Sequence, residues 1–164
     1  MEHLGYMIIV LSCANLVLIL ANIYIPPTSS KYAPSSMPTC STNMTDTTAF
    51  ANILQLLFED MLRLQCAYND RAPVMCAMGD FNAHTGSLQG ILQNDTTWLL
   101  NSKLSTFSKR FSCDTRHDAR GRQLLAAVRD NGFCILNGRC WGDPLGACTY
   151  QARGASSVLD YVLI

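Results

Sequence analysis

The sequence predicts an α/β sandwich whose helices lie outside its sheets. Three observations predict this class: β-branched apolar runs of strand length, two stretches with apolar residues at helical spacing, and the alternation of these patterns along the 164 residues. The length suits one domain, so residues 1–164 are expected to form a single one. With 49% hydrophobic and only 15% charged residues, the chain is not of the disordered class, which is charge-rich and apolar-poor.

The first strands are expected in an apolar run from Met7 to Ile25. Sixteen of its 19 residues are apolar, which approaches the ~20 residues of a membrane-spanning helix. The run is nevertheless rich in Ile and Val, residues 12–15 divide it, and Pro26 and Pro27 end it. Two neighbouring buried strands are therefore the favoured interpretation. A small membrane-anchored protein is the alternative.

A loop, a helix and a strand are expected next. Residues 28–48 are rich in Ser, Thr and Pro and predict a surface loop. Asp46 or Thr47 can cap a helix that runs to about Tyr68. Six apolar residues at helical spacing give this helix one apolar face: Phe50, Ile53, Leu54, Leu57, Met61 and Leu64. Residues 74–78 then predict a short buried strand.

The second half predicts one more helix and three strands. Asp118 can cap a helix over residues 120–131, and Gly132 stands where a glycine commonly follows a helix. Strands are expected at residues 133–137, 147–150 and 158–164.

The net charge is zero but unevenly distributed. Residues 1–100 hold three basic against seven acidic residues, and residues 101–164 hold nine against five. Residues 103–122 contain six Lys or Arg and two Asp. Such a patch can hold phosphates or can be a solvated surface. Four of its residues and one histidine are candidate phosphate- or nucleic-acid-binding groups: Lys109, Arg110, Arg116, Arg120 and His84.

The eight cysteines contain no Cys-x-x-Cys pair and no zinc-ligand spacing. We expect free thiols in a reducing compartment, the nucleus or the cytoplasm.

The motif whose residues could take part in a reaction is Gly79-Asp80-Phe81-Asn82, directly after the strand at residues 74–78. Loops at strand ends often display reactive groups. At a spacing of two, Asp80 and Asn82 are expected on the same side of the chain. A carboxylate beside an amide can orient a water and hold a phosphate oxygen, as metal-assisted phosphoester cleavage requires. Alone, however, the motif is also a turn signature.

The context of this motif resembles the endonuclease/exonuclease/phosphatase superfamily with the DNase I-like fold. The matching pieces are Tyr-Ile-Pro-Pro at residues 24–27, Gly-Asp-Phe-Asn at 79–82, Gly-Arg-Gln-Leu-Leu at 121–125 and Leu-Asp-Tyr at 159–161. These motifs are most similar to those of the endonuclease domain of non-LTR retrotransposons, and the resemblance covers nearly the whole chain. The resemblance implies a four-layer α/β sandwich, with two β-sheets packed face to face and helices outside.

The resemblance also implies roles for matching residues. Tyr24 corresponds to a tyrosine against the scissile phosphate, and Asp80 to the aspartate that positions or deprotonates the attacking water. Asn82 corresponds to the asparagine that contacts the phosphate and orients that aspartate. Asp160 corresponds to the aspartate that supports a catalytic histidine. The implied cofactor is Mg²⁺ or Mn²⁺, for which Asp80 is a possible ligand, and the implied partner is DNA.

The chain departs from the family at two places. The metal-binding glutamate of the family has no counterpart, because Glu2 precedes the first expected strand and Glu59 lies mid-helix. A Ser-Asp-His element after the Leu-Asp-Tyr strand is also absent. We therefore expect an incomplete endonuclease-type domain with weak or no activity. The alternatives are a non-catalytic, nucleic-acid-binding or degenerate fragment, and the membrane-anchored protein.

Overall fold

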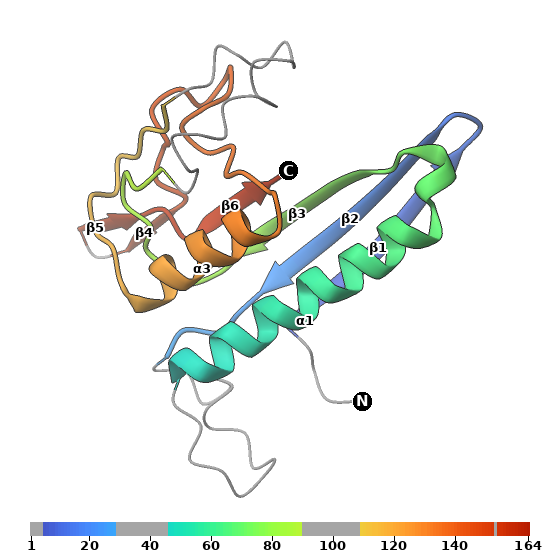
Figure 1. Cartoon of the computed structure of the whole chain (residues 1–164). Coiled ribbons are helices and arrows are strands. Elements are labelled where there is room, and N and C mark those ends of the chain that lie inside the picture. The colour runs from blue at the N-terminus through green and yellow to red at the C-terminus, as the bar shows by residue number, and fades with distance from the viewer. Residues whose placement is uncertain (1–4, 29–45, 90–108, 153) are drawn as a thin grey trace, which may run out of the picture. The chain divides into compact units, whose positions relative to one another are not determined.

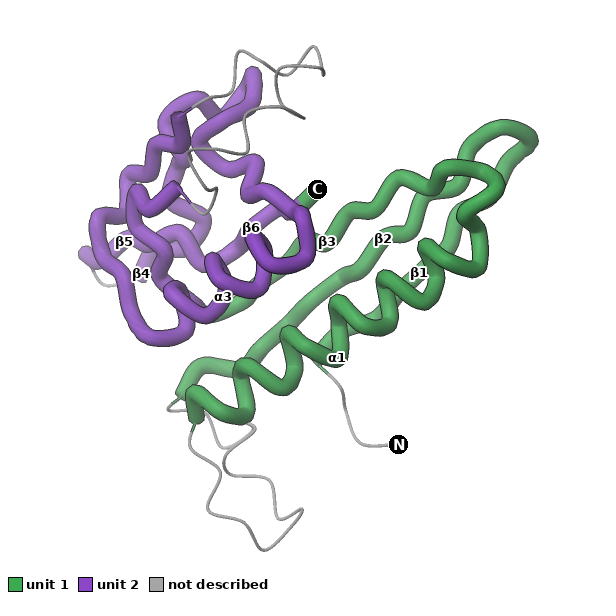
Figure 2. The backbone as a smooth tube through the Cα atoms, in the orientation of Figure 1, with its two compact units in different colours: residues 1–82, 164 green, residues 83–163 purple. Residues whose placement is uncertain are grey.

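The computed structural model describes residues 5–28, 46–89, 109–152 and 154–164. The chain forms two compact units, residues 1–82 with 164, and residues 83–163 (Figure 2). Most of the expected loop at 28–48, residues 103–108 of the basic stretch, and Glu2 lie outside the described residues.

Unit 1 contains three neighbouring strands and a long helix (Figure 1). Strands β1 (Tyr6–Cys13) and β2 (Leu16–Tyr24) form an antiparallel hairpin, and β3 (Val74–Asp80) pairs with β2 in parallel. Helix α1 (Asp46–Ala67) and the short 3₁₀ helix η2 (Asn69–Arg71) connect β2 to β3. This confirms two strands within the apolar run from Met7 to Ile25. In the described part of the chain, no helix has the length and apolarity to span a membrane.

The core of unit 1 lies on one face of these strands. Side chains alternate between the two faces of a strand, and one series in β2 is buried: Val17, Ile19, Ala21 and Ile23. Helix α1 packs on β2 and supplies its buried stripe: Ala49, Phe50, Leu54, Leu57, Phe58 and Met61. The helix predicted from this spacing is confirmed, with Phe58 as an additional core residue.

The prediction of burial is wrong for the opposite face of β1. Met7, Ile9 and Leu11 of β1 are 55%, 41% and 53% exposed, so the expectation that both strands are buried is wrong for β1. These residues share the strand face that α1 does not cover. The sequence does not reveal this, because both faces of β1 are apolar.

Unit 2 contains α3 (Ala119–Asp130), the antiparallel pair β4 (Tyr150–Ala152) and β5 (Ala155–Ser157), and β6 (Asp160–Leu163). The Asp118 side chain accepts the backbone N–H of Gly121 at 2.6 Å, which confirms the predicted cap. Gly132 follows the helix with φ 72°, a left-handed conformation that favours glycine.

Two strand predictions in unit 2 are wrong in detail. Residues 133–137 form one isolated bridge, Ile135 to Leu163, rather than a strand. The Asn137 carboxamide explains this, because its Oδ1, not a backbone carbonyl, accepts the N–H of Val162 at 2.9 Å. The strand expected at 147–150 begins only at Tyr150, and β5 was not predicted. The α/β class itself is confirmed, with two helices and two separate sheets among the described residues.

Candidate active site

Asp80 and Asn82 form a hydrogen-bonded turn at the end of β3. The backbone N–H of Asn82 donates to Asp80 Oδ1 at 2.8 Å, and Asn82 Nδ2 donates to Asp80 Oδ2 at 3.0 Å. Asn82 Nδ2 also donates to the carbonyl of Ile25 at 2.8 Å. Both oxygens of the carboxylate therefore accept from one residue, which fixes the plane of the carboxylate.

A turn, rather than strand alternation, brings these two side chains together. Asn82 has φ 45°, a left-handed conformation that asparagine tolerates better than most residues. Phe81 and Ala83 on either side are 0% exposed. The buried neighbours anchor the turn, so the expected proximity of Asp80 and Asn82 is confirmed for a different local reason.

Asn82 is placed to orient Asp80. Its Nδ2 has two hydrogens, and both are engaged, with Asp80 and with the Ile25 carbonyl. A phosphate contact through this nitrogen requires one of these bonds to be replaced. The geometry thus fits the orienting role implied by the resemblance, and the phosphate contact stays a prediction.

Glycine at position 79 allows β3 to approach β2 closely. Gly79 has φ 137°, and a Cβ there would lie 2.0 Å from the carbonyl oxygen of Ile23. The two residues are Cα partners in the parallel register, and the next pair is Tyr24 with Asp80. The Ile25 N–H continues the pairing by donating to the Asp80 carbonyl at 2.9 Å. Glycine at position 79 is therefore required by the register that places Tyr24 beside Asp80.

Tyr24 completes the site in unit 1. Partnered residues on adjacent strands project to the same face, and Tyr24 is 57% exposed. A phenol hydroxyl is a hydrogen-bond donor for an anionic oxygen, and a carboxylate accepts a proton or orients a water. Tyr24, Asp80 and Asn82 thus lie together at the ends of β2 and β3, and the roles that the resemblance implies for them stay predictions.

The implied divalent cation requires more oxygen ligands than these residues supply. Mg²⁺ takes about six oxygen ligands and often uses one or two carboxylates with water and phosphate. The described residues contain no group of three His, Cys, Asp or Glu side chains able to hold a metal. At this site the described residues thus offer one carboxylate, Asp80, and no fuller set of ligands, so no catalytic step below passes through a metal.

Asp160 begins β6 in unit 2. Its backbone N–H donates to Thr149 Oγ1 at 3.1 Å, and its carbonyl accepts from Asn137 Nδ2 at 3.1 Å. These bonds fix the backbone that carries the carboxylate. Its role in supporting a histidine stays a prediction.

His84 belongs to a buried hydrogen-bond cluster in unit 2. Its Nδ1 lies 2.8 Å from Oδ2 of Asp114, whose side chain is 3% exposed. Asp114 also accepts the backbone N–H and the Nε–H of Arg116 and the N–H of Val158. Burial of Asp114 opposes ionisation, but the hydrogen bonds from His84 and Arg116 outweigh it and lower the carboxyl pKa to about 2. Sequence reasoning missed Asp114, whose only signal was its position within a basic stretch.

The basic candidates divide into exposed and buried groups. Lys109 is exposed, with Nζ 5.4 Å from the centre of the Phe111 ring, and Arg116 is half-exposed. Arg110 and Arg120 are only 1% and 3% exposed. Their predicted place in a solvent-facing phosphate patch is therefore wrong.

The buried Arg110 has protein partners instead of a ligand. Its guanidinium donates to the carbonyls of Gly86, Leu88 and Asn137 and to Thr85 Oγ1, at 2.8 to 3.3 Å. Burial lowers its pKa from the usual arginine value. Charge counting alone does not distinguish such an arginine from a surface one.

The Asp114 cluster predicts an acid-sensitive stability. The carboxyl has an unfolded-state pKa near 3.8 and a folded value of about 2, so its stabilisation is complete above the first and is lost as pH falls through the second. The loss corresponds to about 2 kcal/mol. Urea unfolding at a series of pH values from 7 to 2 is expected to show this decline, and Asp114→Asn is expected to reduce it by that amount.

Asp130→Asn is the matched control, because the Asp130 side chain is 62% exposed. It is expected to leave the pH dependence within ~0.5 kcal/mol of the parent chain. A decline as steep in Asp114→Asn as in the parent would contradict the role of the cluster.

Comparisons with known proteins give a similarity at the level of solved structures. No protein-family model matches the sequence, and no curated protein matches it. The structure is similar to a solved retrotransposon endonuclease domain. That domain belongs to TRAS1, a telomere-specific non-LTR retrotransposon, with 17% identity and a TM-score of 0.47 over 99% of this chain and 51% of that chain. The chain thus spans about half the length of that protein.

Proposed function

We propose that this chain is part of an endonuclease-type domain whose Tyr24, Asp80 and Asn82 face a DNA phosphodiester. The observation that carries the proposal is the Asp80 carboxylate, held through both oxygens by Asn82 at the end of β3. An isolated turn motif does not require an exposed tyrosine on the adjacent strand, whereas a tyrosine hydroxyl can donate a hydrogen bond to a phosphate oxygen. Here Tyr24 is the exposed register partner of Asp80.

The proposed reaction is hydrolysis. Asp80 orients a water molecule and takes its proton as the water oxygen bonds to phosphorus. The phosphorus–oxygen ester bond breaks, and the leaving oxygen takes a proton from solvent. The Tyr24 hydroxyl donates to a non-bridging oxygen on which charge develops, and Asn82 keeps the carboxylate in place. Slow turnover is expected for two reasons. Among the described residues, no histidine side chain is shown beside Asp160, and no group of three side chains can bind a metal.

A plasmid-nicking assay in Mg²⁺-containing buffer tests this assignment. We expect slow conversion of supercoiled plasmid to the open circle by the parent chain. Asp80→Asn keeps the shape of the side chain but removes its basicity, so nicking is expected to fall roughly 10²-fold, within the range typical of a lost general base.

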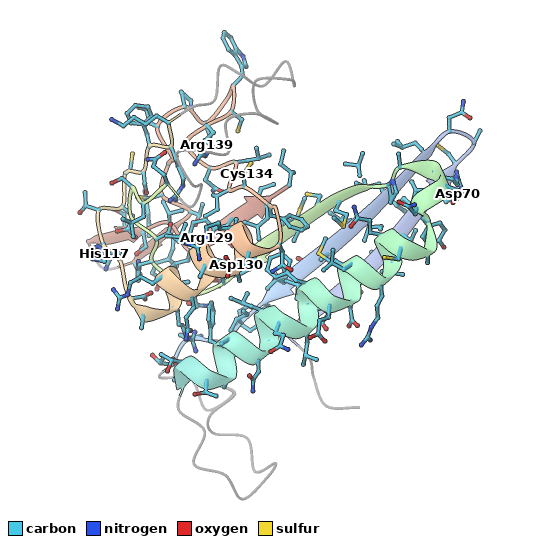
Figure 3. All side chains as sticks on the ribbon, in the orientation of Figure 1. Asp70, His117, Arg129, Asp130, Cys134 and Arg139 are labelled. Atoms are coloured by element: carbon cyan, nitrogen blue, oxygen red, sulfur yellow. The ribbon has the colours of Figure 1, made fainter. Side chains whose placement is uncertain are left out.

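Asp70→Asn is the control for the same chemical change. Asp70 is exposed in η2, just before the start of β3 (Figure 3), and is separated from Asp80 by roughly 20 Å of strand. It is expected to nick at the parent rate. No nicking by the parent chain would contradict cleavage, and equal nicking by parent and Asp80→Asn would contradict the assigned site.

A further inference from the structure

One loop of unit 2 presents a tryptophan entirely to solvent. Trp141 is 99% exposed, and Leu145 in the same loop is 65% exposed. Arg139, two residues before Trp141 and labelled in Figure 3, is only 5% exposed and donates to the carbonyl of Gln89 at 2.6 Å. The loop therefore turns a basic side chain inward and its largest aromatic side chain outward. Burying an aromatic ring is worth roughly 1.5–3 kcal/mol, a gain that the isolated chain does not obtain.

Hydrogen bonds close this loop tightly. The Asp143 N–H donates to the Cys140 carbonyl at 3.0 Å, which makes a four-residue turn with Trp141 at its second position. Gly142 at the third position has φ 105°, a value that favours glycine. The Asp143 carboxylate accepts the N–H of Gly138 at 3.1 Å and that of Ala147 at 2.7 Å. One carboxylate thus joins both ends of the loop.

The base of the loop is fixed to the segment that carries Phe111. Phe111 N–H donates to the Gly138 carbonyl at 3.1 Å, and Cys113 N–H donates to the Gly146 carbonyl at 2.9 Å. A Cβ on Gly138 would lie 1.8 Å from the Phe111 carbonyl oxygen, and one on Gly146 would lie 2.4 Å from it. Trp141 is therefore displayed on a preformed support, and a ligand does not have to order the loop.

The charges beside this support are positive. Phe111 is 47% exposed, with the Lys109 ammonium 5.4 Å from its ring centre. The same segment carries Arg116, whose guanidinium is bonded to Asp114, Ser156 and Ser157. Its two acids are not presented to solvent in the same way, because Asp114 is buried and bonded to Arg116, and Asp118 caps α3. Exposed aromatic rings beside basic side chains are the recognition chemistry of unpaired nucleobases and their phosphates.

We propose that Trp141 is a stacking site for an unpaired base of single-stranded nucleic acid, with Lys109 facing its phosphates. A protein surface is the other ligand class for an exposed Trp, but charge complementarity favours the anionic strand. The proposal rests on the proposed function only for the class of ligand, a nucleic acid. It adds that the chain binds this nucleic acid as a single strand.

Fluorescence anisotropy of a labelled twelve-nucleotide thymidine strand, at low salt without divalent cation, tests the proposal. The parent chain is expected to bind it more tightly than a duplex of equal length. Trp141→Ala is expected to weaken binding about tenfold, in the range for loss of one stacked base. Trp141→Leu keeps an apolar side chain without a ring and is expected to weaken binding equally, whereas Trp141→Phe retains part of the affinity.

A spectroscopic readout locates the contact. The sequence has two tryptophans, Trp98 and Trp141, so Trp98→Phe leaves Trp141 as the single reporter. Its fluorescence is expected to be quenched on titration with the unlabelled strand. Far-ultraviolet circular dichroism checks that the variant is folded; if it is not, protection of Trp141 from oxidation in the parent chain replaces the fluorescence readout.

Three results would overturn the proposal: equal affinities of Trp141→Ala and parent, parent affinity in Trp141→Leu, or no response of Trp141 to the strand. The Asp70→Asn chain, changed at an exposed residue of η2, is expected to bind the strand as the parent does. A chain that binds through Trp141 but never nicks plasmid therefore supports this inference while contradicting the proposed hydrolysis.

Discussion

Gly79→Ala is expected to destabilise the chain by about 4 kcal/mol. This is the sum of two costs, the strain of placing alanine in a left-handed backbone conformation and the steric overlap of its Cβ. The added Cβ would lie 2.0 Å from the Ile23 carbonyl oxygen. Because both atoms belong to paired strands, the overlap is relieved only by separating β2 from β3. Urea unfolding followed by circular dichroism measures the loss, which is large against the 5–15 kcal/mol of a typical domain.

Gly132→Ala separates the two causes. Gly132 also has a positive φ, 72°, but a Cβ there meets nothing within 4 Å. It is expected to cost only about 1 kcal/mol, the backbone part alone. Similar costs for the two substitutions would contradict a close approach of β3 to β2, and with it the register that pairs Tyr24 with Asp80.

Arg110→Met is expected to cost about 3–5 kcal/mol, because it removes a buried cation from partners arranged around it. Methionine keeps the aliphatic length but leaves three carbonyls and the Thr85 hydroxyl without the donors they have now. The Tyr161 ring, 5.8 Å from the guanidinium carbon, also loses its cationic neighbour. Thermal and urea unfolding measure this loss.

Arg122→Met is the matched control on the exposed surface of α3. It is expected to change the free energy of unfolding by less than ~0.5 kcal/mol. If Arg110→Met were equally mild while weakening nucleic-acid binding, Arg110 would be a ligand-facing residue after all, as its charge alone suggests.

Local patterns predicted the elements of unit 1 well. The helical spacing from Phe50 to Met61 gave α1, and the break at residues 12–15 gave the hairpin of β1 and β2. The exposed face of β1 was not predictable, because apolar residues occupy both of its faces and tertiary packing decides which is covered. Residues 133–137 looked like a strand because they begin with an apolar run. Phe133, Cys134 and Ile135 are buried as such a run suggests, although only an isolated bridge forms there.

The candidate site was predictable where its residues are close together in the sequence. Asp80 and Asn82 are two residues apart, and a strand-end turn brings them together. Burial of Arg110 and the Asp114 cluster depend on contacts between residues 24 to 44 positions apart, which charge counting does not reveal. Trp141 carried no sequence signal either, since a tryptophan is usually largely buried.

The central claim is that Tyr24 and Asp80 face a phosphodiester, and a nuclear magnetic resonance titration tests it most directly. The ligand is a dinucleoside phosphate, with the neutral methylphosphonate analogue as its uncharged counterpart. We expect saturable shifts of the Tyr24 ring and Asp80 carboxyl signals with the phosphate, and much weaker shifts with the analogue. Unchanged signals at both residues, with shifts confined to Lys109 and Arg116, would contradict it.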